Sequence, residues 1–379
     1  MVEEEITGGS VLRFWIAGGG TGGHVYPGLA VLRALEAVGP VEVTYVGGKG
    51  SVEERLVRRA GVRFVGIPAG GVHGLAPWRA AWNLTKLARG FGATLRLGRR
   101  ERPRALFVTG GYASVPVALA AWALRVPILV YLPDIEPGLA VRFIARLAIQ
   151  VAVTTEDSRA YFPGRKVVVT GYPVRPEFAG LTREEARKRL GLPQEEPLLL
   201  VFGGSHGARS INRAVTAVLE ELLRMAQVVH ISGRLDWPWV SERAERLPAD
   251  LRSRYHPYPY LHEEMGHALA AADLVVCRAG ASTLGELPYF GLPAVLVPYP
   301  HAWRYQRVNA EWLARRGAAV VLEDERLSEA LLPTVRRLLA DPDRLDRMRE
   351  RSRAVARPDA AARLAELLYA AADGGGEEG

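Results

Sequence analysis

The chain has 379 residues, of which 49% are hydrophobic and 24% are charged, and this length and composition predict a globular protein of two domains. No apolar run approaches the roughly 20 residues that a membrane span needs, and residues 1–10 are acidic where a secretory signal would be basic, so we expect a cytoplasmic protein. The net charge of +8 points to an acidic partner, and the single cysteine, Cys277, excludes an internal disulfide.

The first half of the chain alternates short apolar runs with amphipathic helical stretches. A strand, a helix and a second strand are predicted at 10–17, 25–38 and 41–46. Pro27 is expected in the first turn of that helix, and Ser51 with Glu54 forms a capping box that predicts the start of the next helix. Strands that alternate with helices in this way indicate an α/β fold with a parallel, doubly wound sheet.

The loop after the first predicted strand has the glycine spacing of a dinucleotide-binding turn, with Gly18, Gly20 and Gly23 in the pattern GxGxxG. A dinucleotide site also needs an acidic residue at the end of the second strand to hold the ribose hydroxyls. Gly47 and Gly48 occupy that place. An NAD-dependent oxidoreductase is therefore the weakest of the functional hypotheses.

The positive charge is concentrated in the first half of the chain. Residues 1–170 carry 21 Lys and Arg against 12 Asp and Glu, and residues 73–104 hold eight basic residues against one acid. Within 72–100, basic side chains interleave with apolar and aromatic ones, namely Trp78, Arg79, Trp82, Leu84, Lys86, Leu87, Arg89 and Phe91. This composition predicts an interfacial helix that docks on an anionic membrane, although a helix that faces the core would show similar periodicity.

The alternation of strands and helices restarts at 197–223, where an apolar strand, a glycine turn and a long helix are expected. The stretch 171–197 is rich in proline and charge and is predicted to link two Rossmann-like units. The first ten residues and the tail 373–379 are expected to be disordered. Two such units predict a substrate cleft between the carboxyl ends of both sheets.

The second unit carries a polar motif at 272–310, with a strand, a Gly-Ala-Ser-Thr turn, a helix, a second strand and a polar loop. Ser282 and Thr283 stand at the start of the helix, where free backbone N–H groups can bind a diphosphate. Glu286 lies one turn further on and can accept hydrogen bonds from two neighbouring ribose hydroxyls. The motif therefore predicts a site for a nucleoside diphosphate.

Six segments carry a resemblance to a known family. They are GGGTGGHVYPG (18–28), GGYAS (110–114), GYPVR (171–175), GGSHGARSIN (203–212), CRAGASTLGEL (277–287) and GLPAVLVPYPH (291–301). In this order they resemble the MurG family of bacterial glycosyltransferases, which are UDP-N-acetylglucosamine:N-acetylmuramyl-(pentapeptide) pyrophosphoryl-undecaprenol N-acetylglucosamine transferases. The resemblance runs from about residue 11 to residue 370 and implies a GT-B fold.

The resemblance implies that the two domains bind different substrates. Residues 1–170 would bind lipid I, residues 171–350 would bind UDP-GlcNAc, and a last helix at 357–371 would cross back onto the first domain. N-acetylglucosamine would pass with inversion to the 4-hydroxyl of the muramyl residue, giving lipid II for peptidoglycan synthesis at the cytoplasmic face of the membrane. Neither a catalytic metal nor a cofactor is expected, because fixed donors and a helix N-terminus can stabilise the departing UDP.

The resemblance also implies roles for individual residues. His24 would help to take the proton of the acceptor, and Asp134 is a second candidate for this role. Arg175 would lie near the diphosphate, Glu286 would bind the ribose, and Leu261 would contact uracil through its backbone. The expected substrate-binding residues are Thr21, Gly22, Gly23, Tyr112, Asp134, Arg175, Ser205, Leu261, Arg278, Ala281, Ser282, Thr283, Leu284, Gly285, Glu286, Tyr305, Gln306 and Asn309.

Two positions depart from the family pattern, and several residues have a structural alternative. Tyr305 stands where relatives commonly have glutamine, and residues 131–134 read YLPD where many members read HEQN. Asp134 falls on the asparagine position, where it binds the sugar, acts as a base or is only a turn aspartate. Arg278 is either a substrate contact or a structural ion-pair residue, and Leu261 either contacts uracil or packs in the core.

The sequence leaves other functions open. A glycolipid glycosyltransferase or a UDP-GlcNAc 2-epimerase would share the fold, and a non-catalytic protein would bind UDP-GlcNAc without turnover. An epimerase needs no lipid and no basic apolar face, so the 73–104 segment argues against it. The expected partners are UDP-GlcNAc, undecaprenyl-linked lipid I and an anionic membrane surface, with cell-wall synthesis proteins as further candidates and no nucleic acid.

Overall fold

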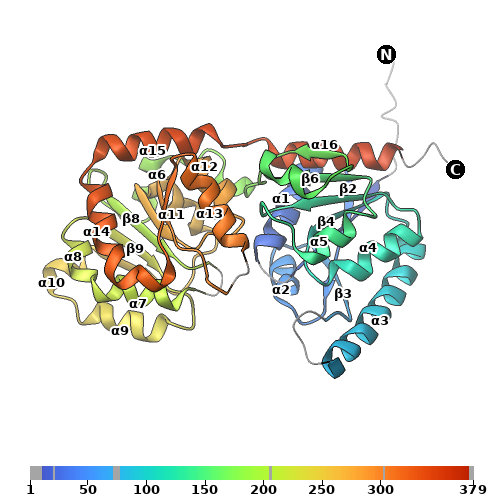
Figure 1. Ribbon diagram of the computed structural model, residues 1–379, viewed down its shortest axis with the longest axis horizontal. Helices are drawn as coiled ribbons and strands as arrows, with labels where there is room; N and C mark the ends of the chain where they lie inside the picture. The colour runs from blue at the N-terminus through green and yellow to red at the C-terminus, as the bar shows by residue number, and fades with distance from the viewer. Residues whose placement is uncertain (1–10, 20–21, 71–76, 205–206, 302–303, 375–379) are drawn as a thin grey trace, which may run out of the picture.

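Two α/β domains form the protein in the computed structural model, which describes residues 11–19, 22–70, 77–204, 207–301 and 304–374 (Figure 1). Each domain is built on a parallel sheet with helices on both faces, which confirms the predicted fold class. Within the described ranges, no helix is both long enough and apolar enough to cross a membrane.

The first sheet has seven strands in the order β3-β2-β1-β4-β5-β6-β7. They are β1 (Leu12–Gly18), β2 (Val41–Gly48), β3 (Arg63–Ile67), β4 (Ala105–Gly110), β5 (Ile128–Leu132), β6 (Gln150–Val153) and β7 (Val167–Val169). One face is covered by α1 (Gly22–Val38) and α2 (Val52–Arg59), and the other by α3 (Pro77–Glu101), α4 (Ser114–Ala123) and α5 (Leu139–Ile144). The alternation of strand side chains explains both layers, since Phe14 and Ile16 face the first group of helices and Trp15 faces the second.

The second sheet has six strands in the order β10-β9-β8-β11-β12-β13. They are β8 (Leu198–Phe202), β9 (Gln227–Ile231), β10 (Tyr255–Tyr258), β11 (Leu274–Cys277), β12 (Ala294–Leu296) and β13 (Ala319–Val321). One face is covered by α6 (Arg183–Arg189), α11 (Glu264–Ala271), α12 (Thr283–Phe290) and α13 (Tyr305–Arg315). The other is covered by α7 (Arg209–Ala217), α8 (Leu219–Leu223), α9 (Trp237–Glu245), α10 (Ala249–Arg252), α14 (Leu327–Leu339) and α15 (Pro342–Ala354).

The last helix, α16 (Ala360–Gly374), leaves the second domain and packs on the first (Figure 1). Leu364, Ala365 and Leu368 join the core that α1 and β1 form. The Tyr369 ring meets the Phe14 ring edge-on, with centroids 5.4 Å apart. The chain therefore crosses between the domains twice, and the helix that ends it is part of the first core.

The two crossing segments lie against each other. Gly171, on the first crossing, has a φ of +91°, and a Cβ built there would lie 2.3 Å from the Cβ of Arg357 on the second. Only glycine permits both this backbone conformation and this close approach. Gly171, the first residue of the GYPVR segment, thus allows the two crossing segments to pack closely.

The predicted linker at 171–197 is wrong over most of its length. Helix α6 packs on α11, and Arg187 is fully buried although the sequence suggests a solvated charge. Its guanidinium donates to Asp273 (2.7 Å) and to the carbonyls of Ala271 (3.1 Å) and Pro193 (2.8 Å). Because these partners satisfy its donors, the arginine is buried without an unpaired charge, and the segment belongs to the second domain.

Helix boundaries differ from the prediction at three places. Helix α1 begins at Gly22, so Pro27 lies in its second turn rather than its first. The long helix expected after β8 is divided at Val218, whose φ of −118° and ψ of 25° separate α7 from α8. Helix α16 extends to Gly374 because Ala371 and Ala372 pack into the core, so residues 373–374 are helical rather than disordered. The first ten residues and 375–379 lie outside the described part of the chain.

The capping box at the start of α2 is confirmed in part. The Ser51 hydroxyl accepts a hydrogen bond from the backbone N–H of Glu54 (3.3 Å). The Glu54 carboxylate accepts in return from the N–H of Gly50 (2.7 Å), one residue before the expected donor. The Ser51 bond satisfies an N–H group that the helix start leaves without a partner, and the Gly50 bond ties the preceding residue to the first turn.

Candidate active site

His24 lies in the first turn of α1, directly after β1. Its backbone carbonyl accepts a hydrogen bond from the Thr109 hydroxyl (2.6 Å) at the end of β4. Gly110 follows with a φ of +113°, and a Cβ built there would lie 3.3 Å from His24 Cδ2. Glycine at this position therefore leaves room for the imidazole, which is held where the first and fourth strands end.

Two carboxylates act on the charge of His24. Burial lowers the pKa of His24 below its usual range, and the negative charges of Asp134, after β5, and Glu53, in α2, oppose this effect. Burial raises the pKa of Asp134, while His24 and a hydrogen bond from Asn309 lower it. A neutral imidazole supported by a nearby carboxylate is the arrangement that a general base needs.

Asn309, on α13, joins the two domains at this point. Its Nδ2 donates to Asp134 Oδ1 (2.8 Å) and to the carbonyl of Ala279 (3.2 Å), and its Oδ1 accepts from the N–H of Ile135 (3.2 Å). Asn309 is fully buried, so these bonds satisfy an amide that has no access to water. Asn309 thus links Asp134 to the second domain, and its expected role in substrate binding stays a prediction.

We expect the substitution Asp134→Asn to move the acid limb of the pH–rate profile to lower pH. The Asp134 charge raises the pKa of His24, so its removal lets burial lower that pKa further. As the expected base, His24 must be neutral to take a proton, so we expect activity to fall on the acid side as the imidazole is protonated, and the variant should keep the imidazole neutral to a lower pH. The profile of kcat/KM reports this pKa in the free enzyme. An acid limb that stays in place or moves to higher pH would contradict the coupling.

Glu286, which is buried, and Arg175, which is half-buried, form an ion pair in the second domain. Arg175 Nη2 lies 3.5 Å from Glu286 Oε1, in the first turn of α12. Burial raises the pKa of Glu286, and the Arg175 charge and a Ser282 hydrogen bond lower it. The Arg175 guanidinium also lies over the rings of Tyr26 (5.0 Å) and Phe178 (4.4 Å), so it connects α1 of the first domain with the second.

Two polar groups, one in this pair and one beside it, lack hydrogen-bond partners among the described residues. They are the Arg175 Nε and the Tyr172 hydroxyl, and both are buried. Tyr172 packs on α12 at Gly285, where a Cβ would lie 2.6 Å from the Tyr172 Cβ. Because buried polar groups are normally hydrogen-bonded, these two mark a place for a polar ligand beside Glu286.

The turn before α12 is more closed than the sequence suggests. Thr283 donates to the Gly280 carbonyl through both its backbone N–H (3.0 Å) and its hydroxyl (2.6 Å). The N–H of Leu284 is likewise bonded within the turn, to Ala281. Some of the N–H groups that were expected to be free at the start of this helix are thus hydrogen-bonded within the turn. The helix dipole still places partial positive charge here, but fewer N–H groups can donate to a ligand.

Arg278 has the contacts of a structural residue. Its guanidinium pairs with Asp324 and donates to the Ser210 hydroxyl (2.7 Å) and to the carbonyls of Val297 and Pro298 (both 3.3 Å). These partners occupy its donors, which favours the ion-pair alternative over a substrate contact. Leu261 and Leu284 are buried in the core of the second domain, as the packing alternative for Leu261 expects, and Ala281 is buried too.

The remaining residues that were predicted to bind substrate are distributed over both domains. Gln306 Oε1 accepts from the N–H of Tyr299 (2.9 Å), which shapes the polar loop. A Cβ built on Gly138 of the first domain would lie 3.5 Å from the Tyr305 hydroxyl. Burial and the charges of Glu136 and Asp134 raise the pKa of Tyr305. Tyr112 is exposed after β4, and Gly22 and Gly23 are in the first turn of α1. Thr21 and Ser205 lie outside the described residues.

Comparison with known proteins decides the family. Residues 14–153 match the glycosyltransferase family 28 N-terminal domain, and residues 198–364 match the C-terminal domain of that family. A UDP-N-acetylglucosamine--N-acetylmuramyl-(pentapeptide) pyrophosphoryl-undecaprenol N-acetylglucosamine transferase from Roseiflexus sp. (strain RS-1) is 44% identical over 94% of this chain and 94% of its own. The enzyme of the same name from Desulforudis audaxviator is 40% identical over 94% of this chain and 98% of its own. The chain belongs to the MurG family.

Solved structures agree with this assignment. The crystal structure of Acinetobacter baumannii MurG has a TM-score of 0.74 with this chain, at 26% identity, over 95% of this chain and 100% of that one. A UDP-GlcNAc 2-epimerase from Neisseria meningitidis has a TM-score of 0.66 at 13% identity, over 95% of this chain and 100% of that one. The second likeness shows only that the fold is shared. The expected GT-B fold is confirmed, and as a MurG-family member the chain is a glycosyltransferase rather than an oxidoreductase or a non-catalytic binding protein.

Sequence reasoning missed Glu53. It is buried, and its Oε1 accepts from the N–H of Gly48 (3.3 Å). A Cβ on Gly19 would lie 2.4 Å from the same oxygen, so the carboxylate packs against the glycine loop. A negative charge here disfavours a dinucleotide pyrophosphate. The sequence signal for Glu53 is an acidic residue just after the second strand. The capping box accounts for its neighbour Glu54 but not for Glu53.

A second missed feature is a contact between the domains at Asp157. Trp312 Nε1 and Arg316 Nη2, on and just after α13, both donate to Asp157 Oδ2, at 2.9 Å and 3.0 Å. Asp157 belongs to the first domain, so this contact and the Asn309 link connect α13 with the first domain.

Among the described residues, no group of three or more His, Cys, Asp or Glu side chains is placed to hold a metal ion.

Proposed function

We propose that this MurG-family glycosyltransferase uses His24 and Asp134 to transfer N-acetylglucosamine from UDP-GlcNAc to the 4-hydroxyl of the muramyl residue of lipid I, with inversion. The product is lipid II, the undecaprenyl-linked disaccharide of peptidoglycan synthesis. The observation that carries the proposal is the placement of His24 near Asp134, which Asn309 links to the domain that contains Glu286 and Arg175.

In the proposed step, the acceptor hydroxyl attacks the anomeric carbon as the bond from that carbon to UDP breaks. The hydroxyl proton passes to His24, which becomes an imidazolium that the Asp134 charge stabilises. The departing UDP gains negative charge, which Arg175 and the positive end of α12 can balance. Glu286 would accept the ribose hydroxyls, and Arg175 would then exchange its present partner, Glu286, for the diphosphate.

The direct test is an assay with purified protein, labelled UDP-GlcNAc and lipid I in the presence of a chelator. We propose that the reaction needs no metal or cofactor, so transfer should persist in EDTA and the product should have the mass of lipid II. Hydrolysis or epimerisation of UDP-GlcNAc without an acceptor, or transfer only to another lipid, would instead identify a different enzyme of the same fold.

We also propose that the protein docks on the cytoplasmic face of the membrane through α3, α4 and α5, which together cover one face of the first sheet (Figure 1). Large apolar side chains are exposed on these three helices, namely Trp82, Leu84, Trp122, Leu139 and Phe143. Trp82 and Trp122 are 60% and 59% exposed, which is unusual for tryptophan unless it meets a partner or a lipid interface. Several basic side chains near the end of α3 are exposed as well.

We expect the combined substitution of four arginines by glutamine to reduce binding to anionic vesicles and to slow transfer to full-length lipid I. The four are Arg96, Arg99, Arg100 and Arg102. Each base near an anionic surface contributes about 1 kcal/mol, which salt attenuates. Transfer to a short-chain, water-soluble acceptor should be nearly unchanged, because the substitutions lie far from His24.

A matched control removes the same charge from the second domain, with glutamine at four exposed arginines, Arg315, Arg326, Arg336 and Arg337. This control should bind vesicles as the wild type does. Vesicle sedimentation and initial rates with both acceptors provide the measurement. Equal losses on both acceptors, or equal effects of the two variants on vesicle binding, would show that the α3 arginines do not dock the enzyme.

A further inference from the structure

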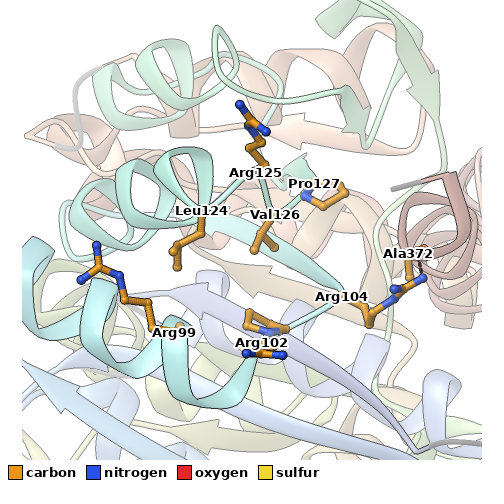
Figure 2. A pocket seen from close by; sticks show the side chains of 10 residues that line it. Arg99, Arg102, Arg104, Leu124, Arg125, Val126, Pro127 and Ala372 are labelled. Carbon is orange, nitrogen blue, oxygen red and sulfur yellow. Dashed lines mark hydrogen bonds between the residues drawn. The ribbon is translucent and has the colours of Figure 1, made fainter. Parts of the chain in front are cut away.

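A cavity of about 420 Å³ opens at the edge of the first sheet where the strands begin (Figure 2). It is bounded by the residues just before β4 and β5, by the ends of α3 and α4, and by Ala372 near the end of α16. His24 and Asp134 lie at the opposite edge, where the strands end. The cavity therefore belongs to no step of the proposed transfer.

Four arginines line this cavity, and no acidic residue does. They are Arg99, Arg102, Arg104 and Arg125. Among the described residues none of the four has a carboxylate within ion-pair distance, and Arg104 donates to the carbonyl of Ala372 (2.8 Å) (Figure 2). The acid nearest in sequence, Glu101, is already bound by Arg63 and by the Trp15 indole (2.9 Å). The cavity thus gathers positive charge that no carboxylate balances within the described ranges of the chain.

The backbone at two of these arginines is unusual. Arg102 directly follows α3 and Arg125 lies two residues past α4, and they have φ values of 50° and 58°. No other non-glycine residue in the described part of the chain has a positive φ. Glycine is the common residue at such a helix end because a Cβ makes the left-handed conformation costly. Both helix ends thus carry a strained arginine where glycine would be easier, and both arginines line the same cavity.

We propose that this arginine cavity binds the phosphate of an anionic phospholipid headgroup. Guanidinium groups match phosphate oxygens in pairs, and several of them around one cavity favour a phosphate over a single carboxylate. The apolar lining of Leu124, Val126 and Pro127 suits the glycerol and ester part of a lipid. The exposed Trp122 lies three residues before Arg125, on the face proposed to meet the membrane. The choice of a lipid rests on that proposed docking, whereas the phosphate chemistry does not.

The test is a double variant, Arg102→Gly and Arg125→Gly, with Arg100→Gln as the matched control. Arg100 is exposed at the end of the same helix but does not line the cavity. Binding of dihexanoyl phosphatidylglycerol below its micelle concentration is measured by calorimetry, alongside inorganic phosphate. We expect the double variant to bind the soluble lipid at least about tenfold more weakly, and the control to bind it as the wild type does. The melting temperature of the double variant should be equal or higher, because glycine adopts the left-handed backbone without strain.

Several results would overturn the proposal. Equal weakening by the control would mean diffuse surface charge rather than a site. Inorganic phosphate that binds as tightly as the soluble lipid, and displaces it, would make free phosphate the ligand. Retained lipid binding in the double variant, with a lower melting temperature, would give the arginines a role in helix capping alone. Transfer to a water-soluble acceptor should be unchanged in every variant, so a failure of the transferase assignment would be seen separately, in the wild type.

Discussion

The substitution His24→Ala is expected to lower kcat for transfer to lipid I by roughly 10²- to 10⁴-fold, the usual contribution of general acid–base catalysis. The KM for UDP-GlcNAc should change little, because Glu286 and Arg175 lie in the second domain and keep their contacts. Steady-state kinetics with each substrate varied in turn provide the measurement. The loss falls on kcat because the proton is transferred only in the reacting complex.

The variant His24→Asn is the matched control, since it keeps a polar side chain of similar shape in the first turn of α1 but cannot take a proton at neutral pH. It should be as slow as the alanine variant. Both variants keep the hydrogen bond from Thr109, because it goes to the His24 backbone carbonyl, and thermal unfolding checks that each variant is folded. Activity within a few-fold of the wild type in either variant would return His24 to a structural role.

The substitution Glu286→Ala is expected to raise the KM for UDP-GlcNAc with a smaller effect on kcat. Two hydrogen bonds from ribose hydroxyls to a carboxylate contribute about 1.5 to 3 kcal/mol each before compensation. The free enzyme already pairs this carboxylate with Arg175, so nucleotide binding must break that pair and part of the gain is offset. We therefore expect an increase in KM of about 10- to 100-fold, well below the sum of the two bonds.

The variant Glu286→Gln separates the charge from the shape of this side chain. It can still accept from a ribose hydroxyl, so its KM should fall between those of the wild type and the alanine variant. In both variants the half-buried Arg175 loses its anionic partner, and thermal unfolding should report a destabilisation that UDP reverses in part when its diphosphate replaces the carboxylate. Unchanged nucleotide affinity in a folded alanine variant would remove Glu286 from the donor site.

Short-range patterns in the sequence account for most of the fold. The apolar runs predict β1 and β2, Ser51 predicts the start of α2, and a second series of strands and helices predicts a second sheet. The candidate residues His24 and Glu286 were found in the same way, because each follows a glycine turn after a strand. Caps, strand alternation and helix turns depend on residues only a few positions apart, so one sequence is enough to recognise them.

The sequence by itself thus determined the two parallel α/β units, the family resemblance and the basic character of α3. Only the tertiary structure decided which polar groups meet, such as Asn309 with Asp134 across 175 positions and Arg278 with Asp324 across 46. It also placed Arg187 in the core and brought Arg125 to the same cavity as Arg99, Arg102 and Arg104. The physical reason is that a polar side chain is buried only where distant groups satisfy its donors and acceptors, and no local spacing reveals which groups the folded chain brings there.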